Sequence, residues 1–158
     1  MLCYEQGHLK FEGMNQPLSS FLSEYQDPIY VYNGKHMAFR AKSLQEALPP
    51  NTEIYYALKA NDHRDIVRLF IQMGLGMDVV SLGELTWSLQ QGCPASRIIF
   101  SGVGKTEKEL VHALKIGVRQ INVESLPELY RLNVLTQKLK LKAAIGLRVN
   151  PDVDAQTH

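Results

Sequence analysis

Lys59 is the residue whose type and position most plainly suggest chemistry. It lies in the hexapeptide Tyr-Ala-Leu-Lys-Ala-Asn, residues 56–61, at the end of an apolar stretch, Glu53–Leu58, that is typical of a β-strand. A lysine in such a position has two possible fates. Its long stem can carry the ammonium into solvent, or the amine can be shielded from water and act as a nucleophile toward carbonyl groups. The rest of the chain favours the second fate.

A further group of polar residues follows the apolar stretches along the chain. Its members are Asp78, Ser81, Ser101, Asn122, Glu124, Arg148 and Asn150. Barrel enzymes carry their functional side chains at the carboxyl ends of parallel strands. Asp78 interrupts an apolar strand, and a buried carboxylate needs a partner, which we expect to be Arg148. A purely structural Asp78–Arg148 pair is the competing interpretation, and Ser101, Asn122 and Glu124 are interpreted as turn and cap residues.

The last apolar stretch, residues 144–149, resembles one wall of a pocket. Because side chains alternate along a strand, Ala144 and Gly146 share a face with Arg148 and leave room beneath it. The opposite face carries Ile145, Leu147 and Val149, and we expect helices to cover it.

These residues are placed by a repeat of strand and helix. Apolar strands are predicted at residues 54–58, 76–80, 98–100, 120–123 and 144–149, spaced by roughly 22 residues, as short-looped βα units require. Ser81, Thr106 and Ser125 are each followed three residues later by a glutamate, which is the capping-box pattern for a helix start. This pattern explains Glu84 without a functional role. Left-handed glycines are expected after the helices, at positions 74, 92 and 117.

The regular spacing predicts an α/β fold. We expect about five βα units of a partial (β/α)8 TIM-type barrel over residues 35–158, rather than an open doubly wound sheet with its crevice motif. A complete barrel takes about 250 residues, so the chain is expected to be the front part of a longer protein. Residues 1–34 are predicted to belong to a second, β-rich domain, with strands at 7–13 and 29–32 and a helix at 18–25.

Composition excludes several classes of protein. The net charge is +1 without a basic run, so nucleic-acid binding is not expected. The chain has two cysteines, no secretion signal and no apolar run long enough to cross a bilayer, so a cytoplasmic protein is expected. His36, His63 and His112 lack ligand spacing, so no metal site is expected. Gly102–Thr106 mimics a phosphate-binding loop, but Ile99 occupies the position of its first glycine, which argues against a nucleotide triphosphatase.

In the order and spacing of several short motifs, the chain resembles the type III, alanine racemase-like decarboxylases that use pyridoxal phosphate, and within them the diaminopimelate decarboxylases. The resemblance covers nearly all 158 residues. Its motifs are Phe11-Glu12-Gly13, residues 29–32, residues 56–61, Asp78-Val79-Val80-Ser81, Gly83-Glu84-Leu85, residues 121–125 and residues 148–154. Leu82 stands where the group usually has glycine, with little effect expected in the first turn of a helix.

The resemblance implies that Lys59 carries pyridoxal 5'-phosphate and is the catalytic residue. It further implies that Asp78, Arg148, Glu84 and His158 lie around the cofactor, although His158 has no defined role. The implied reaction is the decarboxylation of meso-2,6-diaminopimelate to L-lysine and carbon dioxide, the last step of lysine biosynthesis, by a homodimeric enzyme. The group's phosphate loop and several specificity residues lie beyond His158, so this chain alone is expected to be inactive.

Two other interpretations stay open. Another type III decarboxylase, acting on ornithine, arginine or carboxynorspermidine, would share the cofactor lysine. A non-catalytic, truncated barrel protein would share the fold but not the activity. The choice of diaminopimelate depends mainly on residues 148–154 and His158.

Overall fold

The chain forms two compact units, Met1–Leu48 and Pro49–His158, in a computed structural model that describes residues 2–153. Each unit has its own sheet, of two strands in the first and five in the second. In the part of the chain that is described, no helix combines the length and apolar character needed to span a bilayer.

The first unit begins with a β-hairpin. Strands β1 (Leu2–Glu5) and β2 (His8–Phe11) pair antiparallel, and Gln6 and Gly7 connect them with φ angles of 51° and 78°. Positive φ at both central residues is the geometry of the tight turn that hairpins favour. The predicted strand at residues 7–13 is therefore the shorter β2, and its partner β1 was not predicted.

Two helices complete the first unit. Helix α1 spans Leu18–Leu22, and α2 spans Gly34–Ala47, with the Asn33 side chain accepting a hydrogen bond from the His36 N–H. The prediction of a strand at residues 29–32 was wrong, because this segment has no regular structure. A strand needs a neighbour for its backbone hydrogen bonds, and none of the described strands pairs with this segment.

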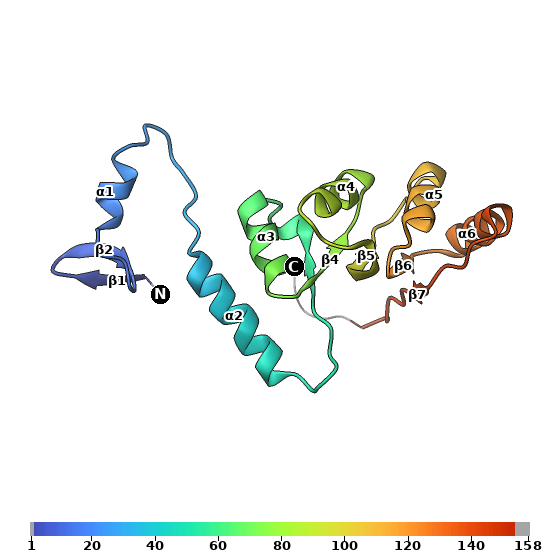
Figure 1. Cartoon of the computed structure of the whole chain (residues 1–158), viewed down its shortest axis with the longest axis horizontal. Coiled ribbons are helices and arrows are strands. Elements are labelled where there is room, and N and C mark those ends of the chain that lie inside the picture. Colours follow the sequence, from blue (N-terminus) through green and yellow to red (C-terminus); the bar gives the residue numbers. More distant parts are fainter. Residues whose placement is uncertain (1, 154–158) are drawn as a thin grey trace. The chain divides into compact units, whose positions relative to one another are not determined.

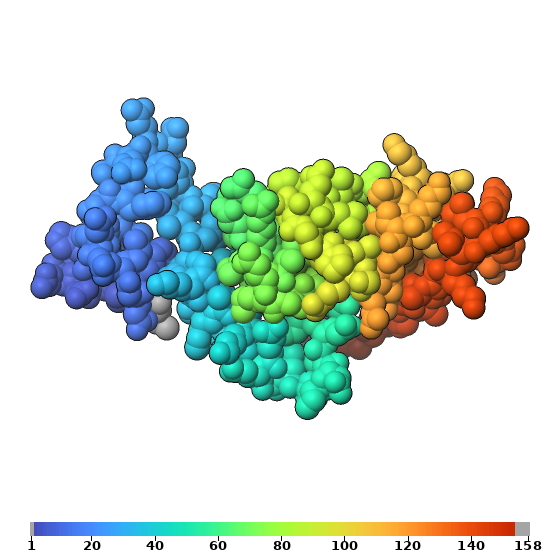
Figure 2. Space-filling view, in the orientation of Figure 1, coloured from blue at the N-terminus to red at the C-terminus, as the bar shows by residue number. Residues whose placement is uncertain are grey.

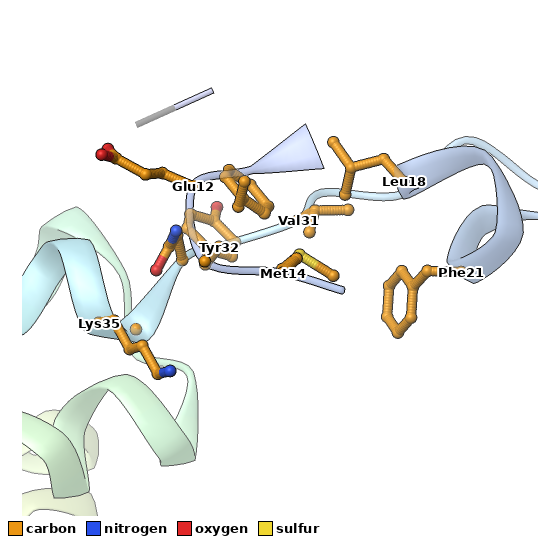
Figure 3. A pocket seen from close by; sticks show the side chains of 11 residues that line it. Glu12, Met14, Leu18, Phe21, Val31, Tyr32 and Lys35 are labelled. Carbon is orange, nitrogen blue, oxygen red and sulfur yellow. The ribbon is translucent and has the colours of Figure 1, made fainter. Parts of the chain in front are cut away.

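The apolar residues of the first unit surround an open hollow of about 440 Å³. Figure 3 shows Met14, Leu18, Phe21 and Val31 around it, with Glu12 and Lys35 at its margin. Leu18 is the one buried apolar residue within residues 2–48. This unit therefore has little core of its own.

The second unit contains a five-stranded parallel sheet in the order β3-β4-β5-β6-β7. The strands are β3 (Tyr55–Ala57), β4 (Gly76–Val79), β5 (Ile98–Phe100), β6 (Gln120–Val123) and β7 (Ile145–Leu147). Each strand lies beside its predecessor in the chain, and the connecting helices cover one face of the sheet (Figure 1). This is the predicted α/β succession of βα units, as in part of a barrel.

Four α-helices form the outer layer of this unit. They are α3 (Arg64–Gln72), α4 (Leu82–Gln90), α5 (Glu107–Ile116) and α6 (Leu126–Leu139). In the space-filling view they follow one another in chain order, from green to red (Figure 2). One turn of 3-10 helix, Leu58–Ala60, follows β3, and another, Ala95–Arg97, precedes β5.

The helix starts confirm the predicted caps, with one difference. Thr106 and Glu109 form the complete capping box. Ser81 and Ser125 also accept hydrogen bonds from the third helical N–H, but the glutamates of their helices bond one residue further back, to the N–H groups of Val80 and Glu124. The predicted glycines 74, 92 and 117 all have positive φ, from 73° to 96°.

The core of the second unit lies between the sheet and the helices. Its fully buried members include Leu58, Val67, Met77, Val79, Leu85, Ile98, Phe100, Leu110 and Ile121. Met77 and Val79 point to this core, so the alternation of the strand sends Asp78 to the opposite face. The same alternation on β6 buries Ile121 and Val123 and sends Asn122 to the face of Asp78. Burial of the apolar side chains in the core thus places Asp78 and Asn122 on the same, opposite face of the sheet.

The apolar face of β7 is exposed, contrary to the prediction that helices cover it. The side chains of Ile145, Leu147 and Val149 are 41%, 66% and 79% exposed. The reason is that β7 has one strand neighbour, β6, and α6 packs against β6, among the described residues.

Candidate functional site

The candidate site is an open pocket of about 440 Å³ at the carboxyl ends of the strands. Its lining residues are Lys59, Asp78, Val80, Ser101, Gly102, Gln120, Asn122, Glu124, Gly146, Leu147 and Arg148. Three of the residues that the sequence singled out, Lys59, Asp78 and Arg148, are thus brought together. Glu84 does not line this pocket, and His158 lies outside the described residues.

Lys59 reaches the pocket from a turn rather than from the strand itself. Strand β3 ends at Ala57, and Lys59 is the middle residue of the 3-10 turn Leu58–Ala60, which Leu58 anchors in the core at 0% exposure. Lys59 is exposed, so the expected shielding from water was wrong for the described residues. The reason is that β3 is an edge strand, with β4 on one side only.

A ladder of hydrogen bonds crosses the pocket floor toward Asp78. Gln120 Nε2 donates to Asn122 Oδ1 at 2.7 Å, and Asn122 Nδ2 donates to Ser101 Oγ at 2.9 Å. Ser101 Oγ in turn donates to Asp78 Oδ1. Every donor in this ladder points toward the carboxylate, so Asp78 is held as a hydrogen-bond acceptor by β5 and β6. Ser101 and Asn122, which the sequence suggested were turn and cap residues, thus belong to the hydrogen-bond ladder that holds Asp78.

Gly146 forms part of the same floor. A Cβ atom built there would lie 2.5 Å from Gln120 Nε2 and 2.6 Å from Asn122 Oδ1. The room that a glycine leaves on β7 is therefore taken by these two amide side chains. Gly146 lets the amide ladder lie against the backbone beneath Arg148.

Arg148 pairs with Glu124 and not with Asp78, which corrects the sequence prediction. Arg148 Nη1 lies 3.1 Å from Glu124 Oε2, and Arg148 Nε donates to Asn150 Oδ1 at 3.3 Å. Neighbouring strands are about 4.8 Å apart. Glu124 follows β6, next to the β7 strand that precedes Arg148, whereas Asp78 lies on β4, three strands away. Strand order thus favours Glu124 as the partner.

Glu124 is the pocket residue whose importance the sequence did not reveal. Its side chain is 7% exposed, and it accepts the Gly102 N–H at 3.2 Å in addition to the Arg148 contact. Its own N–H donates to Glu128 Oε2 at 2.9 Å. The position directly after an apolar strand was the available signal, but it suits a cap residue equally well.

Glu84 has a backbone role. Its Oε2 accepts the Val80 N–H at 2.8 Å, which fixes the chain between β4 and α4. Val80 lines the pocket, so Glu84 contacts the site through this backbone group.

Other reactive groups lie away from the pocket. Cys93 is 2% exposed, and its burial raises the pKa of the thiol, which leaves less of the nucleophilic thiolate. Within residues 2–153, no three His, Cys, Asp or Glu side chains are grouped so that they could hold a metal ion. Lys59 is therefore the pocket's candidate nucleophile.

Comparison with known proteins agrees with this geometry. Residues 35–158 match the family model of the pyridoxal-dependent decarboxylases, specifically their pyridoxal binding domain. The chain is 42% identical to the diaminopimelate decarboxylase of Zymomonas mobilis over 146 residues, which cover 90% of this chain and 35% of that protein. It is also 42% identical to the diaminopimelate decarboxylase of Aquifex aeolicus, over 98% of this chain and 36% of that protein.

Solved structures show the same relationship. A crystal structure of diaminopimelate decarboxylase from Helicobacter pylori, complexed with L-lysine, superposes with a TM-score of 0.84 at 36% identity. The match covers 89% of this chain and 36% of that chain. A crystal structure from Aquifex aeolicus gives a TM-score of 0.88 at 40% identity, over 96% of this chain and 37% of that chain. The chain thus spans about a third of the length of these proteins.

Proposed function

We propose that this chain, which belongs to the family of pyridoxal-dependent decarboxylases, is the lysine-bearing part of a diaminopimelate decarboxylase. The observation that carries the proposal is the position of Lys59 in one pocket with Asp78 and Arg148. The whole protein would convert meso-2,6-diaminopimelate to L-lysine and carbon dioxide.

The residues of the pocket fit pyridoxal phosphate in part. An exposed lysine amine can condense with the aldehyde, and Arg148 offers guanidinium donors for an anionic or ring oxygen. When bound, the cofactor supplies an electron-accepting ring that stabilises the negative charge left by departing carbon dioxide. Within the described residues, the pocket's cations are Lys59 and Arg148, and Arg148 is paired with Glu124. The phosphate group therefore needs donors from elsewhere.

Each pocket residue has a separate task in this proposal. Lys59 would hold the cofactor through its amine, and the same amine would be the group that can return a proton. Asp78, kept as an acceptor by Ser101, faces the same pocket as a second acid–base group. Arg148 orients the oxygens of the bound group. Glu84 supports the pocket through Val80, and His158 remains a proposed cofactor contact on the strength of the resemblance.

The assignment of Lys59 can be tested directly. Incubation with pyridoxal phosphate followed by borohydride should leave a stable adduct, which peptide mass spectrometry should find on Lys59. Lys59→Ala should abolish this label, whereas Lys108→Ala, which removes a lysine from helix α5, should not change it. Labelling that spreads evenly over the surface lysines, or that persists in Lys59→Ala, would contradict the assignment.

The substrate is tested on the full-length protein. We expect carbon dioxide release from meso-diaminopimelate and not from L-ornithine or L-arginine. Turnover of L-ornithine or L-arginine alone would favour the alternative, another type III decarboxylase. Absence of any turnover, with the Lys59 adduct still present, would favour a barrel protein that binds the cofactor without this activity.

Four further parts of the proposal concern the whole protein. We place the start of the pyridoxal-binding domain at residue 35, where the family match begins, although compactness groups α2 with the first unit. The preceding 34 residues would belong to a second β-rich domain. We propose a homodimer on the strength of the resemblance, and a cytoplasmic location.

A further inference from the structure

Lys105 is a buried lysine that the proposed chemistry does not use. Its side chain is 1% exposed, and three oxygen atoms lie close to its Nζ. They are the Gly102 carbonyl at 2.6 Å, the Asn122 carbonyl at 2.7 Å and Glu128 Oε1 at 2.9 Å. The two carbonyls accept hydrogen bonds from the ammonium, and the Glu128 carboxylate forms an ion pair with it. A buried charge of this kind is costly unless it is paired in this way.

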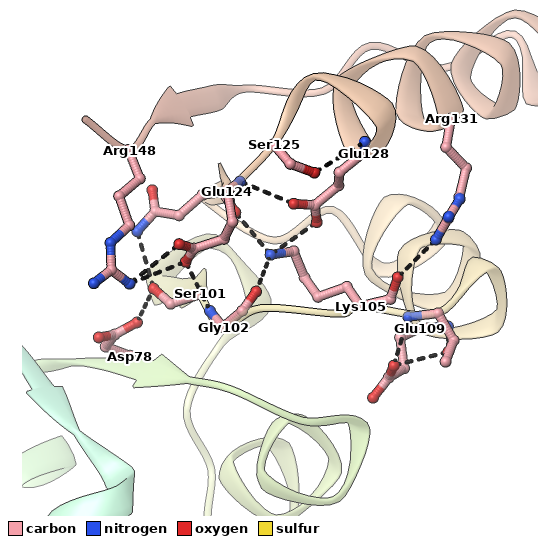
Figure 4. A network of polar contacts seen from close by, with 12 residues as sticks. Asp78, Ser101, Gly102, Lys105, Glu109, Glu124, Ser125, Glu128, Arg131 and Arg148 are labelled. Carbon is pink, nitrogen blue, oxygen red and sulfur yellow. Dashed lines mark hydrogen bonds and ion pairs between the residues drawn. The ribbon is translucent and has the colours of Figure 1, made fainter. Parts of the chain in front are cut away.

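The partners of Lys105 come from three different parts of the second unit. Gly102 lies in the loop after β5, Asn122 lies on β6, and Glu128 lies in the first turn of α6, where its side chain is 7% exposed. Figure 4 shows Lys105 reaching between the two loops and the start of the helix. The single ammonium therefore fixes the spacing between the carboxyl ends of β5 and β6.

Glu124 is the residue on which these contacts converge. Glu128 accepts the Glu124 N–H at 2.9 Å through Oε2, the oxygen that Lys105 leaves free. Gly102, whose carbonyl bonds Lys105, donates its N–H to Glu124 Oε1. The backbone N–H of Glu124 is thus held by Glu128 and its carboxylate by Gly102, and Lys105 contacts both of these residues.

Glu124 in turn contacts Arg148, which lines the pocket. Its carboxylate is 3.1 Å from Arg148 Nη1, and the Arg148 side chain is 56% exposed. A half-exposed arginine has many accessible rotamers, and it takes one orientation only where a fixed partner selects it. The partner here is a carboxylate anchored at 7% exposure.

We infer that Lys105 and Glu128 are positioning residues that set the orientation of Arg148 through Glu124. This inference rests on the proposed function, because its effect is on the binding of pyridoxal phosphate at Lys59. It assigns a functional task to the loop Gly102–Thr106, which the sequence marks only as an incomplete phosphate-binding motif.

A double-mutant cycle on the full-length protein tests the inference. The variants are Lys105→Met, Arg148→Met and the combination, and the readout is the apparent Kd for pyridoxal phosphate from the borohydride-trapped Lys59 adduct. We expect Lys105→Met to weaken binding about tenfold in the wild-type background and to have little effect in Arg148→Met, because interacting residues are not additive. A merely structural role would weaken binding by the same factor in both backgrounds.

Two further variants keep the test decisive. Leu114→Ala removes a buried side chain from α5 without touching the pocket, so it should lower stability and leave the Kd unchanged. Should Lys105→Met fail to fold, Glu124→Gln retains the side-chain size and one oxygen for the Gly102 N–H, but removes the charge that pairs with Arg148. It should show the same dependence on Arg148.

The outcomes separate the two proposals. No Lys59 adduct in the wild-type protein would overturn the proposed function and the inference together. An adduct on Lys59 with additive effects of Lys105→Met and Arg148→Met, or with an unchanged Kd in Glu124→Gln, would overturn the inference alone.

Discussion

At the scale of single residues, two serines show that the contribution of a hydroxyl to stability depends on its hydrogen-bond partners. Ser101 donates to the Asp78 carboxylate and accepts from Asn122. Ser88, in helix α4, is 0% exposed, and its Oγ has no hydrogen-bond partner within residues 2–153. The Ser101 hydroxyl donates a hydrogen bond to a charged group. The Ser88 hydroxyl is removed from water on folding and gains no hydrogen bond within the described residues in return.

Ser101→Ala and Ser88→Ala should therefore have different effects on stability. Ser101→Ala should lower the free energy of unfolding by about 1.5 kcal/mol, because a carboxylate loses a donor. Ser88→Ala should be neutral or should stabilise by up to about 1 kcal/mol, since it removes an unsatisfied hydroxyl and alanine favours the helix. Urea unfolding of both variants beside the wild type measures the difference. Equal destabilisation by the two substitutions would contradict this account of the ladder.

Residue types alone could predict which reactive residues line the pocket, but not which side chains bind one another. The sequence indicated Lys59, Asp78 and Arg148 as members of one site, and they line one pocket. It did not indicate Lys105, because a lysine can be buried only where acceptors distant in sequence converge on it. Here one of them is the Asn122 carbonyl, 17 residues away. Such convergence is a property of the assembled sheet and cannot be read from local pattern.

At the scale of elements, helix starts are the features that the sequence predicts best. A capping box needs only a hydroxyl and a glutamate three residues apart, and Thr106 and Glu109 form one. The strand predicted at residues 29–32 was wrong because apolar composition does not provide a pairing partner. The exposed face of β7 was missed for a similar reason, since covering a strand depends on its neighbours in space.

Glu109 links two helices and should make stability depend on pH. Its carboxylate accepts the Thr106 N–H at 2.8 Å and hydroxyl at 2.7 Å, and the Leu82 N–H at 3.0 Å. The hydrogen bonds from Thr106, aided by the one from Leu82, lower the pKa of Glu109 below its ordinary 4.5. A lowered carboxyl pKa contributes stability that is present above the unfolded-state pKa and is lost as pH falls through the folded-state pKa.

Glu109→Gln should expose this contribution. At pH 7 the variant should be less stable by about 0.5 kcal/mol, because it keeps an acceptor but loses the negative charge at a helix N-terminus. The difference from wild type should shrink as pH falls below the ordinary carboxyl range and should vanish in strong acid. Denaturant unfolding at a series of pH values measures it, and a difference that does not change with pH would rule out a charged Glu109 as the cause.

At the scale of the whole molecule, the described sheet is open on both sides. Strands β3 and β7 each have a single neighbour among the described residues. The open edge at β7 bears Ile145 at 41% and Leu147 at 66% exposure. Unpaired backbone groups beside apolar side chains form a surface onto which another strand can add.

The 158-residue chain should therefore self-associate through β7, and Ile145→Lys should weaken this association. A lysine on the edge has to lose its hydration when a second strand pairs there, so the concentration for half-association should rise by about tenfold or more. Val103→Lys is the matched control, because Val103 is 80% exposed but lies in a loop and not on a sheet edge. Sedimentation velocity over a range of concentrations measures both variants. Val103→Lys should associate as strongly as the wild type. If Ile145→Lys does so too, the β7 edge is not the contact, and the exposed hollow of the first unit becomes the next surface to substitute.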